Sequence, residues 1–160
     1  MRNLLLIYVL LLPSMSFGQS KSITRFRSDF KENSNMFFYS STLKMLNTEN
    51  NPEFADLLKD IEEIRVLNYD KATMKISNED IRGLKTALQD EKFNNIMELQ
   101  EKGNSIHLYS REKHGKTVGF VAIIDNTENL VLIDLIGSID VKKFMELKHQ
   151  LDTRTVNASS

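Results

Sequence analysis

Two apolar stretches late in the chain, residues 118–125 and 130–136, restrict the possible folds more than any other feature. The four residues Asn126 to Asn129 join them, and so short a link predicts two antiparallel strands that lie side by side. In both stretches the odd and the even positions are largely apolar, so both faces of each strand are apolar. Strands of this kind belong in the middle of a sheet that is covered on both sides.

The same alternation separates the side chains of each strand into two faces. In the second stretch Asp134 interrupts an otherwise apolar run, which makes that position unusual. Because a large uncovered apolar face would be a binding surface, residues on these faces are the candidate ligand-binding residues. They are Phe120, Ala122 and Ile124 on the first strand, and Leu130, Leu132, Asp134 and Ile136 on the second.

The remaining chain supplies helices first and strands later. Apolar spacing and capping signals predict helices at 22–31, 43–46, 52–61 and 77–89, and a last one from Ser138 or Asp140 to Leu151. Further strands are predicted at 36–39, 64–69, 96–100 and 106–111. The short links between the late strands predict a C-terminal four-stranded meander. We expect an α+β fold: a mixed, largely antiparallel sheet with helices packed mainly on one face.

Helices on one face leave the second face of the central strands to be covered. The usual solution is that the N-terminal helix, 22–31, crosses to that side and closes the core. If it does not, a loop, a second subunit or an apolar ligand must cover the face, because a large exposed apolar patch marks an interaction site.

The first 18 residues form a separate unit. An apolar run extends from Leu4 to Leu12, and Ser16 and Gly18 are small residues at the spacing that a signal peptidase needs. The run has about half of the ~20 residues that span a bilayer, so we expect cleavage before Gln19 rather than a membrane anchor. The predicted organisation is a signal peptide at 1–18, one α+β domain at 19–152 and a disordered tail at 153–160. The mature chain would have no membrane span and would be periplasmic or secreted.

Composition argues against several kinds of chemistry. The chain has 21 Lys and Arg against 22 Asp and Glu, so no basic field is present to bind nucleic acid. Without cysteine there is no disulfide, thiolate metal site or thiol nucleophile. The three histidines, His107, His114 and His149, lack the spacing of a metal site, and no nucleophile motif or phosphate-binding glycine loop is present. We therefore expect no metal, no cofactor and no catalytic residue.

Three features together carry a family resemblance. They are a leader that ends in Gly18-Gln19, the strand Ile64 to Leu67 after an acidic helix, and the run LIDLIGSID from Leu132 to Asp140. The chain resembles the exported Bacteroidetes family known as domain of unknown function 4252, over residues from about Ile23 to Leu151. The resemblance implies an exported accessory protein of the envelope, with a stress-related or regulatory role. It implies no activity and no catalytic motif.

We therefore expect a non-enzymatic exported binding module of the envelope. Its sheet face around Val118 to Ile136, or an edge strand, would bind an apolar ligand or a protein partner. One alternative is a hydrolase with an unidentified site, which a histidine and two carboxylates in one concave pocket would favour. The other is a structural homo-oligomer, which a large flat apolar interface would favour.

Overall fold

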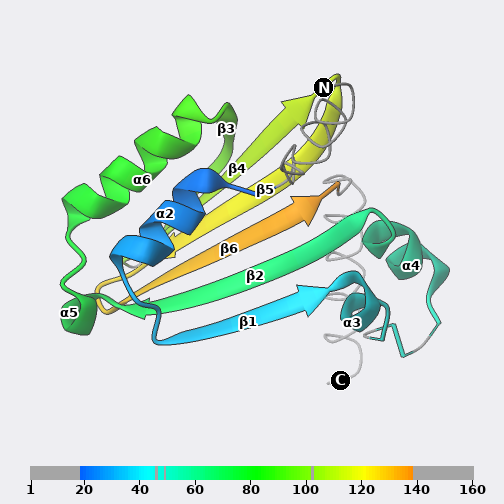
Figure 1. The fold of residues 1–160 in the computed structure, drawn as a ribbon, viewed down its shortest axis with the longest axis horizontal. Helices are drawn as coiled ribbons and strands as arrows, with labels where there is room; N and C mark the ends of the chain where they lie inside the picture. Colours follow the sequence, from blue (N-terminus) through cyan, green and yellow to red (C-terminus); the bar gives the residue numbers. More distant parts are fainter. Residues whose placement is uncertain (1–18, 46, 49, 102, 139–160) are drawn as a thin grey trace, which may run out of the picture.

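The computed structural model describes residues 19–45, 47–48, 50–101 and 103–138. Its centre is a six-stranded sheet in the order β1-β2-β6-β5-β4-β3 (Figure 1). The strands are β1 (Ser34–Tyr39), β2 (Ile61–Asp70), β3 (Phe93–Glu101), β4 (Asn104–Lys113), β5 (Lys116–Asp125) and β6 (Asn129–Gly137). Each neighbouring pair is antiparallel, so the predicted meander from β3 to β6 is confirmed, and the described sheet contains no parallel pair.

The described helices are α2 (Lys21–Asp29), α3 (Ser40–Met45), α4 (Pro52–Leu58), α5 (Lys71–Met74) and α6 (Asn78–Asp90). Side chains before four of them satisfy free N–H groups of the first turn, as helix termini require. Ser20 caps α2, Asn51 caps α4 and Asp70 caps α5. Ser77 and Asp80 form a reciprocal capping box at α6. The α+β fold is confirmed, whereas the single turn of α5 was not predicted.

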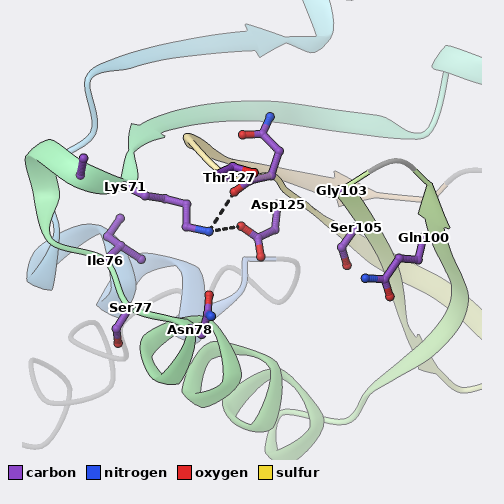
Figure 2. A pocket seen from close by; sticks show the side chains of 11 residues that line it. Lys71, Ile76, Ser77, Asn78, Gln100, Gly103, Ser105, Asp125 and Thr127 are labelled. Atoms are coloured by element: carbon purple, nitrogen blue, oxygen red, sulfur yellow. Dashed lines mark hydrogen bonds and ion pairs between the residues drawn. The ribbon is translucent and has the colours of Figure 1, made fainter.

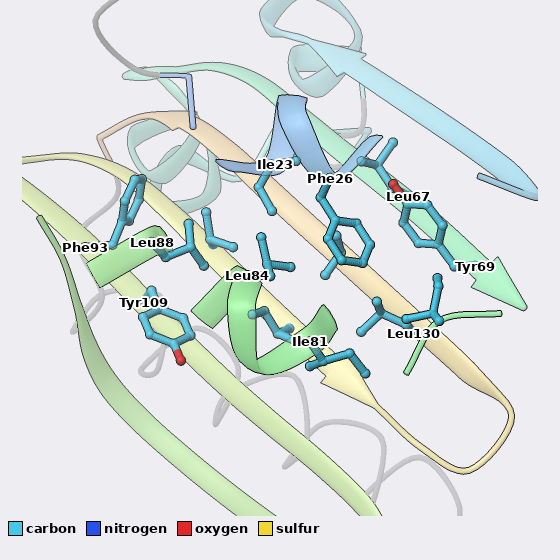
Figure 3. Packing of buried hydrophobic residues seen from close by; sticks show 14 residues of the cluster. Ile23, Phe26, Leu67, Tyr69, Ile81, Leu84, Leu88, Phe93, Tyr109 and Leu130 are labelled. Atoms are coloured by element: carbon cyan, nitrogen blue, oxygen red, sulfur yellow. The ribbon is translucent and has the colours of Figure 1, made fainter. Parts of the chain in front are cut away.

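The two longer helices, α2 and α6, lie side by side over the same face of the sheet (Figure 1). Figure 3 shows their apolar side chains meeting those of the central strands. The buried cluster consists of Ile23 and Phe26 of α2, Ile76, Ile81, Leu84 and Leu88 of or near α6, and Leu67, Tyr69, Phe93, Tyr109, Val121, Ile123, Leu130 and Leu132 of the strands. This cluster is the main core of the domain.

The prediction that the N-terminal helix crosses to the other face is therefore wrong. Phe26 packs edge-on against Tyr69, with ring centroids 5.5 Å apart, on the face that α6 also covers. The Glu91 carboxylate, just after α6, accepts hydrogen bonds from the backbone N–H groups of Lys21 and Ser22. The Glu91 contacts hold α2 beside α6 because they satisfy free N–H groups at the start of α2. The Phe26 contact does so because it fills the apolar space next to α6.

The opposite face is covered at one end by α3 and α4. Leu43 of α3 and Leu58 of α4 pack against a row of strand residues that the register places side by side. The row consists of Phe38, Ile64 and Leu135. Farther from α3 and α4, this face carries half-buried side chains, such as those of Val66, Ile133, Ile124 and Ile106. We call residues 66, 106, 108, 122, 124, 131 and 133 of this face, together with Met97 and Leu99, the open face.

Three predicted segments lie outside the described residues: the leader at 1–18, the last helix up to Leu151 and the tail at 153–160. Within the ranges that the structure describes, none of the helices has the length and apolar character needed to cross a membrane.

Candidate functional site

Large exposed apolar side chains gather on the two edge strands. β1 carries Met36 and Tyr39, at 53% and 56% exposure, and β3 carries three more. These are Ile96, Met97 and Leu99, at 46%, 43% and 47% exposure. An edge strand that presents apolar side chains beside unpaired backbone groups is a template for a further strand. We call Ile96 to Glu101 of β3 the β3 edge.

The β3 edge has few of the features that protect edge strands. The sequence of β3, FNNIMELQE, contains neither proline nor a basic residue. A bulge between Asn95 and Met97 interrupts its pairing with β4, and regular pairing then continues to Glu101. Bulges, prolines and lysines are the usual means of blocking edge pairing. In the described sheet β3 is the end strand, so the part of β3 beyond the bulge has a side on which a partner strand could pair.

The seven candidate ligand-binding residues lie on opposite faces. Phe120 pairs with Leu135 and Ala122 with Ile133, so Phe120, Ala122 and Ile124 lie on the open side of the sheet. The second set lies under α2 and α6, where Leu130 and Leu132 have no exposed surface. That set comprises Leu130, Leu132, Asp134 and Ile136, all buried. One ligand on one face would therefore not contact both sets, and a ligand-binding role for either set stays a prediction.

A polar cleft lies at one end of the helix-covered face (Figure 2). It has a volume of about 590 Å³, and its floor is a row across three strands: Gln100, Ser105 and Asp125. Lys71 closes one side, where its Nζ lies 2.7 Å from Asp125 Oδ1 and 2.9 Å from the Asn126 carbonyl oxygen. Because Lys71 is paired within the protein, the cleft presents mainly neutral hydrogen-bonding groups.

Two residues after Ser105, on the same face of β4, His107 is the centre of a polar cluster. Its Nε2 lies 2.8 Å from Ser105 Oγ and 2.7 Å from Lys85 Nζ, and its Nδ1 lies 3.7 Å from Glu98 Oε2. Burial, reinforced by the charge of Lys85, lowers the pKa of His107, so the ring is neutral at neutral pH. Burial also lowers the pKa of Lys85. A neutral imidazole beside a hydroxyl can act as a general base.

Sequence reasoning missed this cluster. Ser105 and His107 occupy alternate positions of one strand, which places them on the same face, and that signal was visible. The approach of Glu98 depends on the β3–β4 register, and that of Lys85 on the packing of α6. Among the residues that the structure describes, no three potential metal ligands converge.

Asp134 lies beneath the start of α2 and is 1% exposed. Neither carboxylate oxygen has a hydrogen-bond partner. Burial raises the pKa of Asp134 to about 7, although Arg65 and the Ser20 backbone N–H counteract part of the shift. The Ser20 N–H thus lies beside the carboxylate without completing a hydrogen bond. An unpaired buried carboxylate is costly and uncommon, so its surroundings need an explanation.

Comparison with known proteins gives one family and no relative of established function. No curated protein and no solved structure matches the chain. The model of one family, a domain of unknown function (DUF4252), matches residues 21–147, which is most of the chain and includes all six strands. This protein therefore belongs to the DUF4252 family.

Proposed function

We propose that the protein is an exported, non-enzymatic binding module that holds an extended segment of a protein partner against the β3 edge. One observation carries the proposal: three exposed apolar side chains occupy an edge strand that contains neither proline nor a basic residue. Addition of a strand to a sheet edge is a common mode of peptide recognition, in which the backbone supplies affinity and alternate side chains supply specificity. Export rests on the leader predicted at residues 1–18.

The chemistry of the partner segment follows from the charges of the β3 edge. Glu98, whose side chain is 58% exposed and lies on the same face as His107, supplies a negative charge at this edge. An added strand with basic residues at alternate positions would place them on the face of Glu98, where they would attract its carboxylate. Its other side chains would be apolar, because Met97 and Leu99 extend the open face to this edge. A second copy of β3 fits less well, since it would bring further carboxylates to the same edge.

The test uses a short peptide in which lysine alternates with valine, and its counterpart with glutamate in place of lysine. We expect the lysine peptide to shift the backbone amide signals of β3 and β4 and to slow amide hydrogen exchange along β3. The glutamate peptide should leave both unchanged. Glu98→Lys should weaken binding of the lysine peptide at least tenfold, because it replaces attraction with repulsion.

Met45→Lys is the matched control. Met45 is 77% exposed on α3, which lies beside β1 at the far edge of the sheet (Figure 1), so this variant should bind the lysine peptide as the wild type does. Equal binding of both peptides, or signal shifts away from β3 and β4, would contradict the proposal. A mass that doubles with protein concentration, with shifts along β3, would assign the edge to a second copy instead.

A second candidate function is hydrolysis of an ester or amide, because Ser105 Oγ lies 2.8 Å from His107 Nε2 at the floor of the cleft. Glu98 and Asp125 are the two carboxylates near His107, but of these three residues only Asp125 lines the cleft. Ser105 Oγ would attack the substrate carbonyl while its proton passes to His107 Nε2, and the alcohol or amine would leave with that proton. Water would then hydrolyse the acyl–Ser105 ester, releasing the acid and restoring the hydroxyl. Lys85 Nζ occupies the same nitrogen at 2.7 Å, which opposes this role.

A fluorophosphonate probe separates the two functions. A hydrolase would form a covalent adduct at Ser105, visible by mass spectrometry and lost in Ser105→Ala. The binding module that we propose forms no adduct, while its peptide binding persists in Ser105→Ala.

A further inference from the structure

We propose that the α-amino group of the mature chain, released at Gln19, is the cationic partner of the buried Asp134 carboxylate. The inference rests on the proposed export, because hydrolysis of the bond between Gly18 and Gln19 creates this group. A signal peptidase adds water across that bond, leaving a carboxylate on Gly18 and an ammonium on Gln19. The site is therefore built from the chain itself and is completed by processing.

Covalent geometry limits how far the new ammonium can lie from Asp134. The nitrogens of Gln19 and Ser20 are separated by two carbon atoms, so they stay within about 3.7 Å of one another at any backbone angle. The Ser20 N–H lies beside the Asp134 carboxylate, and Ser20 has no exposed surface. The ammonium would thus lie near the Asp134 carboxylate, where an opposite charge favours the ionised form.

The two arginines near Asp134 do not form a hydrogen bond with its carboxylate. Arg65 pairs with Asp134 in the β2–β6 register, but its guanidinium donates to Glu63, with Nε 2.6 Å from Oε1. Arg111 of β4 also faces Asp134, and its Nη1 lies 3.8 Å from Glu91 Oε2. Both arginines are thus shared with other carboxylates, and both oxygens of Asp134 remain without a hydrogen bond.

A second carboxylate strengthens the preference for a cation at this end of α2. Glu91 accepts hydrogen bonds from the backbone N–H groups of Lys21 and Ser22, and from the Ser22 hydroxyl. The first residues of the mature chain therefore lie between Glu91 and Asp134. A positive charge at Gln19 would compensate both, whereas the uncleaved chain has a neutral peptide bond there. Cleavage should accordingly stabilise the fold.

The sign of the pH effect follows from the pKa of Asp134. Without the ammonium, the folded pKa of about 7 lies above the ordinary value of 3.8. The protonated carboxyl is then favoured by the fold, so stability is greatest below pH ~4 and falls as the pH rises to ~7. Pairing with the ammonium would lower the folded pKa and reduce this loss.

The experiment removes the ammonium together with the Gln19 side-chain amide, which donates to Thr24 Oγ1, so the same treatment of Asp134→Asn is the control for the loss of the amide. The chain from Gln19 to Ser160 contains the whole family match and is compared before and after treatment with glutaminyl cyclase. The enzyme closes Gln19 to pyroglutamate, with loss of ammonia and of the positive charge. We expect cyclisation to raise the unfolding equilibrium constant in urea at least tenfold at pH 7 in the wild type, and less than twofold in Asp134→Asn.

Equal effects of cyclisation in both chains would overturn the proposal. A second measurement does not need the variant: the carboxyl carbon of Asp134 should titrate near 7 in the pyroglutamyl chain and clearly lower in the free-amine chain. Identical titration in the two would also overturn it. The N-terminus of the exported protein, read by mass spectrometry, tests processing separately, so failure of export and failure of the ion pair are distinguishable.

Discussion

Truncation of two leucines on different strands tests whether the open face is uncovered. Leu132 of β6 has no exposed surface and lies in the core under α2 and α6, whereas Leu99 of β3 is 47% exposed. Leu→Ala removes three carbon groups, each worth about 0.8 kcal/mol when fully buried, and leaves a cavity in a packed core. Leu132→Ala should therefore lower the free energy of unfolding by about 3–4 kcal/mol.

At Leu99 only about half of the side chain is removed from water, and solvent fills the space that truncation leaves. Leu99→Ala should cost about 1 kcal/mol or less. Equilibrium unfolding in urea measures both losses of stability. The denaturant slope should not change, because neither substitution alters the compactness of the folded or the unfolded state. Equal losses at the two positions would refute the argument, because they would mean that Leu99 is packed as tightly as Leu132.

Three further predictions concern single sites. Gly137→Ala should destabilise the fold by several kcal/mol, because Gly137 has φ +118° and a Cβ there would lie 2.3 Å from the Asp60 carbonyl oxygen; thermal unfolding would show the loss, and an unchanged melting temperature would contradict it. Tyr69→Phe should leave stability equal or raise it by up to about 1 kcal/mol, because the buried Tyr69 hydroxyl has no hydrogen-bond partner; a clear loss in urea unfolding would reveal a missing partner. Ser77→Ala should cost about 1 kcal/mol, since it removes the capping box with Asp80, whereas no loss in the same assay would mean that the cap contributes little.

Local signals predicted the elements well. Asn51 followed by Pro52 correctly marked the start of α4, and Ser77 with Asp80 marked α6, because caps satisfy free N–H groups with side chains close in sequence. The short links between the late strands fixed their antiparallel order. The apolar spacing predicts Ile61 at the end of a helix, but Ile61 begins β2, because an apolar residue at that position fits either period.

Relations between distant segments could not be predicted in the same way. The β5–β6 register pairs Ile124 with Val131, so even-numbered residues of one strand share a face with odd-numbered residues of the other. The Asn126 side chain sets this register by accepting hydrogen bonds from the N–H groups of Glu128 and Asn129. A shift of one residue would place each side chain of β6 on the opposite face of the sheet. The sequence does not contain the register, so it could not show that the candidate residues of β5 and those of β6 lie on opposite faces.

The position of α2 and the cluster at His107 had the same limitation. An amphipathic helix can pack on either face of an apolar sheet, and the choice here depends on Tyr69 and Glu91, far along the chain. The contacts of His107 with Lys85 and Glu98 likewise join three separate elements. Sequence periodicity describes one segment at a time, so it does not contain these contacts.

The central claim is that, within the described part of the chain, α2 and α6 cover one face, α3 and α4 cover only one end of the other, and the β3 edge is left open. Methyl NMR of the leucine residues, recorded with a soluble paramagnetic agent, tests it most directly. We expect strong broadening of the Leu99 methyl signals, while those of Leu130 and Leu132, which have no exposed surface, stay sharp. Leu99 signals as sharp as those of Leu132 would contradict it.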